Sequence, residues 1–270
     1  MRLRAQGRGA LGRGLGASLL VLGSACAAIP PSHRDERFLI QNHGGFTPDE
    51  VDRVRAQLDV GTRALEKYVG SPPVGRFPIV VNLLPGRGVS HSHGGQGAIE
   101  LYWVREVQAP IIHELTQVLA GYTASNGHWT QEGFASYMQD RYGEDLAFPT
   151  RRMADDLVKV LNEDGHLLPM LDVMKDRNRR KYFGLGTPWE RWLAYTQATS
   201  LCGYLLGQYG PEKFFELYDR PFEAIDFRRL YGRTAELLVR DWLSYVAGQP
   251  GDTTRARAVF HQMKALLGRR

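Results

Sequence analysis

The pattern of hydrophobic and polar positions divides the chain into a first part with short apolar segments and a second part with helical periodicity. Short apolar or alternating segments at residues 37–41, 76–84 and 98–104 predict β-strands. Between the last two, residues 86–97 are rich in glycine and histidine, which predicts a surface loop. The first part of the chain therefore predicts a small sheet.

A helix is predicted to begin at Thr47, before the second of these strands. The Thr47 hydroxyl can cap the helix, Pro48 suits its first turn, and Glu50 completes a capping box. Gly70 is expected near its end. Between these limits, apolar residues recur on one helical face: Val51, Val54, Leu58, Leu65 and Tyr68.

Helical spacing dominates from residue 107 onward. Helices are predicted at residues 110–121, 130–142, 153–162, 192–209, 211–218 and 234–246, and residues 251–270 form a basic amphipathic tail. Strands first and helices afterwards are typical of an α+β fold. We expect a small N-terminal sheet with helices, followed by a mostly helical C-terminal half.

The N-terminal segment has the composition of a secretory signal peptide over residues 1–25, followed by a polar tether over residues 26–36. Four arginines precede a short apolar run that ends in small residues. Ordinary cleavage here would release a soluble protein. Alternatively, the sequence Ser-Ala-Cys resembles a bacterial lipobox, and lipidation of Cys26 would anchor the chain to a membrane. Both alternatives predict export, with the chain either lipid-anchored at the bacterial cell envelope or periplasmic or secreted.

Charge and cysteine content narrow the possible classes of function. The formal net charge is +5, but the four N-terminal arginines account for most of it, so the rest of the chain is close to neutral. A nucleic-acid partner is therefore not expected. With two cysteines, a disulfide framework is excluded, and Cys202 is expected to be an inert core residue because its surroundings are apolar.

The candidate chemistry lies in two of the predicted helices. His113 and Gln117 are four residues apart and would project from the same helical face, with Glu114 beside them. Glu132 lies near the start of the next helix and could meet them across a cleft. Such a set could hold a zinc ion with an open position for water, and Glu114 could take the proton from that water.

Residues 113–117 read His-Glu-Leu-Thr-Gln, and residues 129–137 read Trp-Thr-Gln-Glu-Gly-Phe-Ala-Ser-Tyr. Together they resemble the gluzincin zinc metallopeptidases, and most closely the short bacterial peptidase MA-like domains, over most of residues 37–250. The resemblance implies a zincin-like fold, with His113 and Glu132 as zinc ligands and Glu114 as the catalytic base. It also implies that the strand before the metal-binding helix can pair with an extended peptide.

Gln117 departs from this family, which has a histidine at that position. A neutral amide oxygen is a weaker zinc donor than an imidazole nitrogen. His128, four residues before Glu132, is one candidate substitute, and two others are His91 and His93 in the glycine-rich segment. None of the three has a spacing that requires ligation.

Two functions follow from these alternatives. The first is an exported metallopeptidase that hydrolyses peptide bonds through a zinc-bound water, in which Tyr195 could stabilise the oxyanion. The second is a metal-free pseudoenzyme that binds a peptide or protein as an envelope lipoprotein, with Tyr195 simply a buried helical tyrosine. The decisive position is Gln117.

Overall fold

The computed structural model describes residues 33–70, 77–122, 126–146 and 150–268 of the chain. The expected signal peptide, Cys26 and most of the expected tether lie outside the described residues. Within them, no helix is both long enough and apolar enough to cross a membrane.

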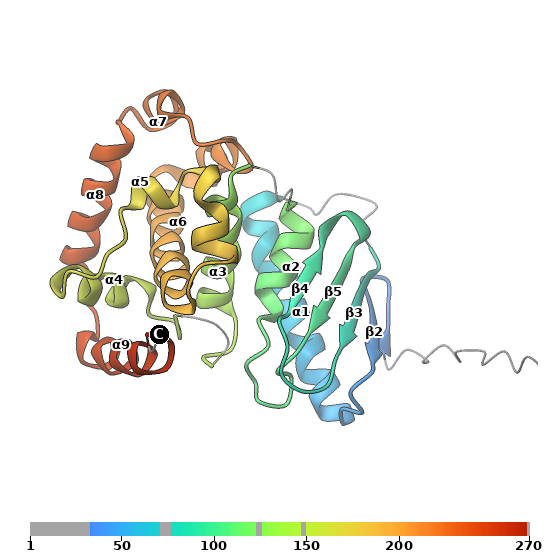
Figure 1. The fold of residues 1–270 in the computed structure, drawn as a ribbon. Coiled ribbons are helices and arrows are strands. Elements are labelled where there is room, and N and C mark those ends of the chain that lie inside the picture. Colours follow the sequence, from blue (N-terminus) through green and yellow to red (C-terminus); the bar gives the residue numbers. More distant parts are fainter. Residues whose placement is uncertain (1–32, 71–76, 123–125, 147–149, 269–270) are drawn as a thin grey trace, which may run out of the picture.

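A five-stranded mixed sheet forms one side of the molecule (Figure 1). Its order is β1 (His33–Arg34), β2 (Phe38–Asn42), β3 (Ile79–Leu83), β5 (Ala98–Leu101) and β4 (His91–His93). The three central strands are parallel, whereas β1 and β4 pair antiparallel with their neighbours. Two residues of the expected tether, His33 and Arg34, are thus part of the sheet.

Helices α1 (Pro48–Val69) and α2 (Ile111–Ala120) cover one face of this sheet. Alternate residues of the central strands point into the shared core, because side chains of a strand alternate between its faces. The predicted capping box of α1 is present, with Gly70 at its C-terminal end. The buried strand residues are Phe38, Ile40, Ile79, Val81, Leu83, Ile99 and Leu101.

The second half of the chain is helical and packs beyond α2 (Figure 1). Helix α3 (His128–Tyr142) lies between α2 and the long helix α6 (Pro188–Leu217), which bends at Gly210 and Pro211. The remaining elements surround α6: α4 (Ala154–Glu163), α5 (Met170–Val173), a 3₁₀ turn (Asp176–Asn178), a π-helix (Arg180–Gly184), α7 (Ala224–Tyr231), α8 (Ala235–Gly248) and α9 (Thr253–Leu267). The predicted α+β class is therefore confirmed.

Several local predictions were wrong. Residues 86–97 are not all loop, because they contain the edge strand β4, which is too short and polar to show an apolar pattern. The strand predicted to reach residue 104 ends at Leu101, and Trp103 has a φ of 63°, which no β-strand residue adopts. That strand, β5, is also interior to the sheet, so the available edge belongs to β4.

The expected amphipathic tail forms helix α9, which packs on α4 and the start of α6. Val259 and Phe260 are buried there in a second hydrophobic cluster with Leu157 and Trp192. The end of the chain therefore contributes to the core of the helical half.

Candidate active site

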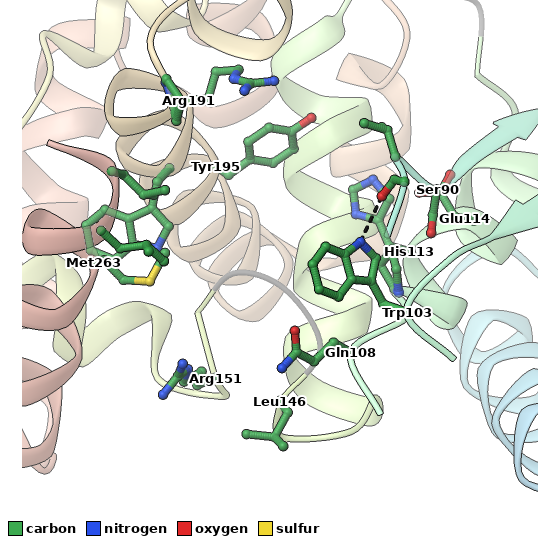
Figure 2. Close-up of a pocket in the computed structure, with 17 residues that line it drawn as sticks. Ser90, Trp103, Gln108, His113, Glu114, Leu146, Arg151, Arg191, Tyr195 and Met263 are labelled. Carbon is green, nitrogen blue, oxygen red and sulfur yellow. Dashed lines mark hydrogen bonds between the residues drawn. The ribbon is translucent and has the colours of Figure 1, made fainter. Parts of the chain in front are cut away.

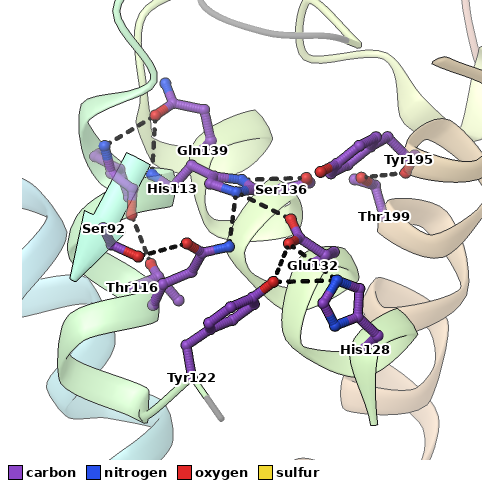
Figure 3. Close-up of polar contacts among 12 residues, drawn as sticks. Ser92, His113, Thr116, Tyr122, His128, Glu132, Ser136, Gln139, Tyr195 and Thr199 are labelled. Carbon is purple, nitrogen blue, oxygen red and sulfur yellow. Dashed lines mark hydrogen bonds and ion pairs between the residues drawn. The ribbon is translucent and has the colours of Figure 1, made fainter. Parts of the chain in front are cut away.

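Helices α2 and α3 bring His113 and Glu132 together in the interior of the molecule (Figure 3). Gln117 lies beside His113, one turn further along α2. The Nε2 atom of His113 lies 3.1 Å from Nε2 of Gln117 and 3.3 Å from Oε2 of Glu132. All three side chains are buried. The three predicted site residues thus converge on one point.

Gln139 fixes α2 relative to α3. Its side-chain oxygen accepts hydrogen bonds from the backbone amides of Ile112 (2.9 Å) and His113 (3.2 Å). These amides lie in the first turn of α2, where a helix has no partners of its own for its N–H groups. The helix that carries Glu132 therefore caps the helix that carries His113.

Close packing of α3 against α6 sets the position of Glu132. A Cβ atom at the neighbouring Gly133 would lie 2.7 Å from Sγ of Cys202 and 2.8 Å from the carbonyl oxygen of Ala198. Only glycine allows the two helices to approach this closely. Cys202 is buried and free, as expected of a core residue, and burial raises the pKa of its thiol.

The side chain of Gln117 has two partners. The Ser92 hydroxyl, from edge strand β4, donates to Oε1 of Gln117 at 2.6 Å, which leaves Nε2 facing His113. When His113 is neutral, its Nε2 atom carries the lone pair toward this amide, and its Nδ1–H faces the Ser136 hydroxyl at 3.3 Å. A turn of the amide by 180° would present Oε1 instead, and Ser92 would accept from the amide nitrogen. A hydroxyl can donate or accept a hydrogen bond, so Ser92 can bind the Gln117 amide in both orientations.

The donor set fits a zinc ion. Within the described part of the chain, Oε2 of Glu132 is buried without a hydrogen-bond partner, although it lies near His113. A buried carboxylate oxygen normally faces a positive group. In the structure that group is His113, whose charge lowers the pKa of Glu132, and a bound cation would take the same place. Two donors about 2.1 Å from a tetrahedral zinc ion lie roughly 3.4 Å apart, close to the separations of 3.1 and 3.3 Å at His113.

The charges of the site favour an ion pair between His113 and Glu132. Burial opposes charge on either partner, but Glu132 and Glu114 raise the pKa of His113 above its usual value. Burial alone would raise the pKa of the Glu132 carboxyl. The contacts of this carboxyl with His113, His128 and Tyr122 outweigh that effect and lower its pKa. Burial raises the pKa of Glu114 to about 7, reinforced by the charge of Glu132 and opposed by His113.

A pocket of about 490 Å³ opens beside this cluster (Figure 2). His113 and Glu114 from α2, Tyr195 from α6 and Trp103 from the segment after β5 line it. Burial and the nearby Glu132 carboxylate raise the pKa of Tyr195, so its hydroxyl stays protonated. The pocket therefore presents a carboxyl group and a hydroxyl donor on either side of His113.

The candidate substitute ligands do not join this point. His128 contacts the opposite oxygen of Glu132, Oε1, at 3.9 Å, and the Tyr122 hydroxyl lies between them, 3.1 Å from Nε2 of His128 and 3.0 Å from Oε1 (Figure 3). Ser92 points toward α2, so strand alternation directs its neighbours His91 and His93 to the other face of the sheet.

The sequence reasoning missed Ser92, Tyr122 and Gln139. Gln139 follows Glu132 by seven residues and so shares its helical face, which was a readable signal. The sequence offers no such signal for Ser92 and Tyr122, because their positions depend on how β4 and the end of α2 meet the site. No model of a protein family, no curated protein and no solved structure gives a match to this chain.

Proposed function

We propose that this chain is a zinc-dependent peptidase of the gluzincin type with a zincin-like fold. The observation that carries the proposal is the approach of Gln117 and Glu132 to Nε2 of His113, at 3.1 and 3.3 Å, beside a pocket that Glu114 lines. The mixed sheet, its antiparallel edge strand and the two following helices agree with that fold. In this proposal His113 and Glu132 hold the ion, and Gln117 supplies a neutral oxygen after its amide turns.

The ion would polarise the carbonyl of the substrate and lower the pKa of a water molecule to about 7. Glu114 has a pKa of about 7, so near neutral pH it can accept a proton from an attacking water and return one to the leaving amine. The protonated hydroxyl of Tyr195 can donate a hydrogen bond to the developing oxyanion.

The substrate would be an extended peptide. Residues 88–90 line the pocket and lead directly into β4, the edge strand of the described sheet. An edge strand offers unpaired backbone groups to which an extended peptide can add as a further strand. A peptide added there would run past Glu114 through a pocket that Arg151 and Arg191 also line, so an acidic side chain of the substrate could be favoured.

A metal-free peptide-binding protein is the second candidate, and one observation favours it. The amide of Gln117 already has partners on both sides, Ser92 at 2.6 Å and His113 at 3.1 Å. A polar network that is satisfied in this way is stable without an ion. The pocket and the edge strand would then bind a peptide without cleaving it.

Three variants separate the two candidates. The peptidase predicts that wild type retains zinc after dialysis, that His113→Gln retains less, and that wild type cleaves an unstructured protein such as casein. Glu114→Gln should keep the zinc and lose cleavage, and any remaining cleavage would indicate a contaminating protease. If Gln117→His gains zinc and cleavage that wild type lacks, the binding protein is correct.

We further propose that the chain acts in the bacterial envelope, either lipid-anchored through Cys26 or released. The motivation is the basic, apolar and small-residue order of residues 1–25. Mass spectrometry of the mature N-terminus distinguishes the two forms. An intact N-terminus beginning at Met1 would rule out both.

A further inference from the structure

Two histidines and a glutamate meet on strands β4 and β5, on the side of β4 opposite to Ser92 and its partner Gln117. His91 pairs directly with Glu100 across the two strands, and His93 lies two residues further along the same strand face. Nε2 of His91 is 3.4 Å from one carboxylate oxygen of Glu100, and Nε2 of His93 is 3.6 Å from the other. Potential ligand atoms of the three residues all lie within 4.8 Å of one another.

The protonation of His91 suits ligation. Its Nδ1 atom lies 3.1 Å from the carbonyl oxygen of Val89, to which only a protonated nitrogen can donate. In the neutral ring Nε2 then carries the lone pair, and this is the atom that faces Glu100. Histidines that bind metals usually donate their other ring nitrogen to a carbonyl or carboxylate in this way.

We propose that His91, His93 and Glu100 bind a late first-row divalent cation, with Zn²⁺ as the representative ion. Imidazole nitrogens with one carboxylate suit these ions, whereas Mg²⁺ and Ca²⁺ prefer oxygen ligands. Each histidine lies 3.4 or 3.6 Å from its own oxygen of Glu100, close to the roughly 3.4 Å expected between two ligands of one tetrahedral ion, so the carboxylate can serve the ion through either oxygen. The three side chains are 31–46% exposed, so solvent can fill the remaining position.

The site has a structural consequence for the edge of the sheet. An ion held by both strands would fasten β4 to β5, which otherwise rest on a pairing only three residues long. Ser92 lies between the two histidines and its hydroxyl binds Gln117 on the other face of the strand. Metal binding would therefore immobilise the strand that holds Gln117, and this role does not depend on peptidase activity.

Equilibrium dialysis of the full chain against Zn²⁺ tests the proposal, with His93→Gln and Glu100→Gln as separate variants. His261→Gln is the matched control, because His261 is an exposed histidine on α9. Each variant retains His113 and Glu132, so the difference from wild type counts only the new site. Both variants should bind about one equivalent less than wild type, or bind it at least about 10-fold more weakly, because even the loss of a residue that only supports a metal ligand costs about 10- to 100-fold in affinity.

The control should bind as wild type does. If His93→Gln and Glu100→Gln both bind Zn²⁺ with the stoichiometry and affinity of wild type, the proposal is overturned. A loss of the same size in His261→Gln would also overturn it, because it would show nonspecific binding to surface histidines. Circular dichroism of each variant verifies its fold, and the exposed position of both residues makes unfolding unexpected.

Discussion

Gly133 provides the sharpest test of how the candidate site is built. It follows Glu132 on α3, at the point where this helix packs against α6. In the Gly133→Ala variant the added methyl would lie 2.7 Å from Sγ of Cys202 and 2.8 Å from the carbonyl oxygen of Ala198. The second contact is with backbone, so a rotation of one side chain cannot relieve it, and α3 must move away from α6.

The magnitude follows from two opposing effects. Overpacking of a well-packed core costs about 1–3 kcal/mol. Alanine in place of glycine within a helix stabilises by about 0.5–1 kcal/mol, because it reduces the freedom of the unfolded chain. The net result should be a loss of roughly 1–2 kcal/mol in the free energy of unfolding.

Gly207→Ala is the matched control. Gly207 also lies inside a helix, α6, but it is exposed, and a Cβ atom there would have no neighbour within 4 Å. Only the favourable effect remains, so this variant should gain up to about 1 kcal/mol. Urea denaturation at constant pH measures both. If Gly133→Ala is as stable as Gly207→Ala, the close approach of α3 and α6 is refuted.

Three further predictions concern the supporting structure. Phe260→Ala should lose about 3–5 kcal/mol of unfolding free energy, because the side chain of Phe260 is 1% exposed. Leu266→Ala should change the unfolding free energy by less than about 0.5 kcal/mol, because Leu266 is 69% exposed. Equal losses in urea denaturation would contradict the packing of α9. Gln139→Leu should lose about 2–4 kcal/mol of unfolding free energy, because two buried backbone amides of α2 lose their acceptor. Gln139→Glu keeps an acceptor oxygen and should lose less. The opposite order would be inconsistent with this cap. Burial raises the pKa of Asp140 from 3.8 to about 7, so the folded chain keeps a proton that the unfolded chain releases as pH rises through this window. The contribution of Asp140 to stability should therefore fall between about pH 4 and 7, by roughly 4 kcal/mol for about three pKa units, and Asp140→Asn should lack this fall. Parallel pH curves for the two proteins would show that Asp140 does not titrate in this way.

The sequence predicted those elements whose signals are local. The capping box at Thr47 placed the start of α1, and the apolar strands placed the centre of the sheet. A second capping box at Thr187 and Glu190 was equally readable but was overlooked, so α6 begins earlier than the predicted residue 192. No element was predicted at residues 177–181, where a 3₁₀ turn leads into a π-helix that contacts α6. Short elements of this kind depend on tertiary packing, which has no periodic pattern.

In the candidate site, too, local signals were readable from the sequence and tertiary contacts were not. The i, i+4 spacing correctly brought His113 and Gln117 to one helical face. Helix geometry alone could not show that Ser92 would reach Gln117 from an edge strand, since this contact joins residues 25 positions apart. Nor could it exclude His128, which the Tyr122 hydroxyl separates from the point of convergence.

The cap that Gln139 provides has a consequence for how such a protein can evolve. It holds α2 through the backbone amides of Ile112 and His113, which every residue type except proline possesses. The orientation of the two helices therefore places no requirement on the side chain at position 117. An exchange between histidine and glutamine there can alter metal affinity while the frame around it persists. Under the proposed function, a single substitution at position 117 would therefore exchange peptide cleavage for peptide binding, in either direction, without loss of the fold.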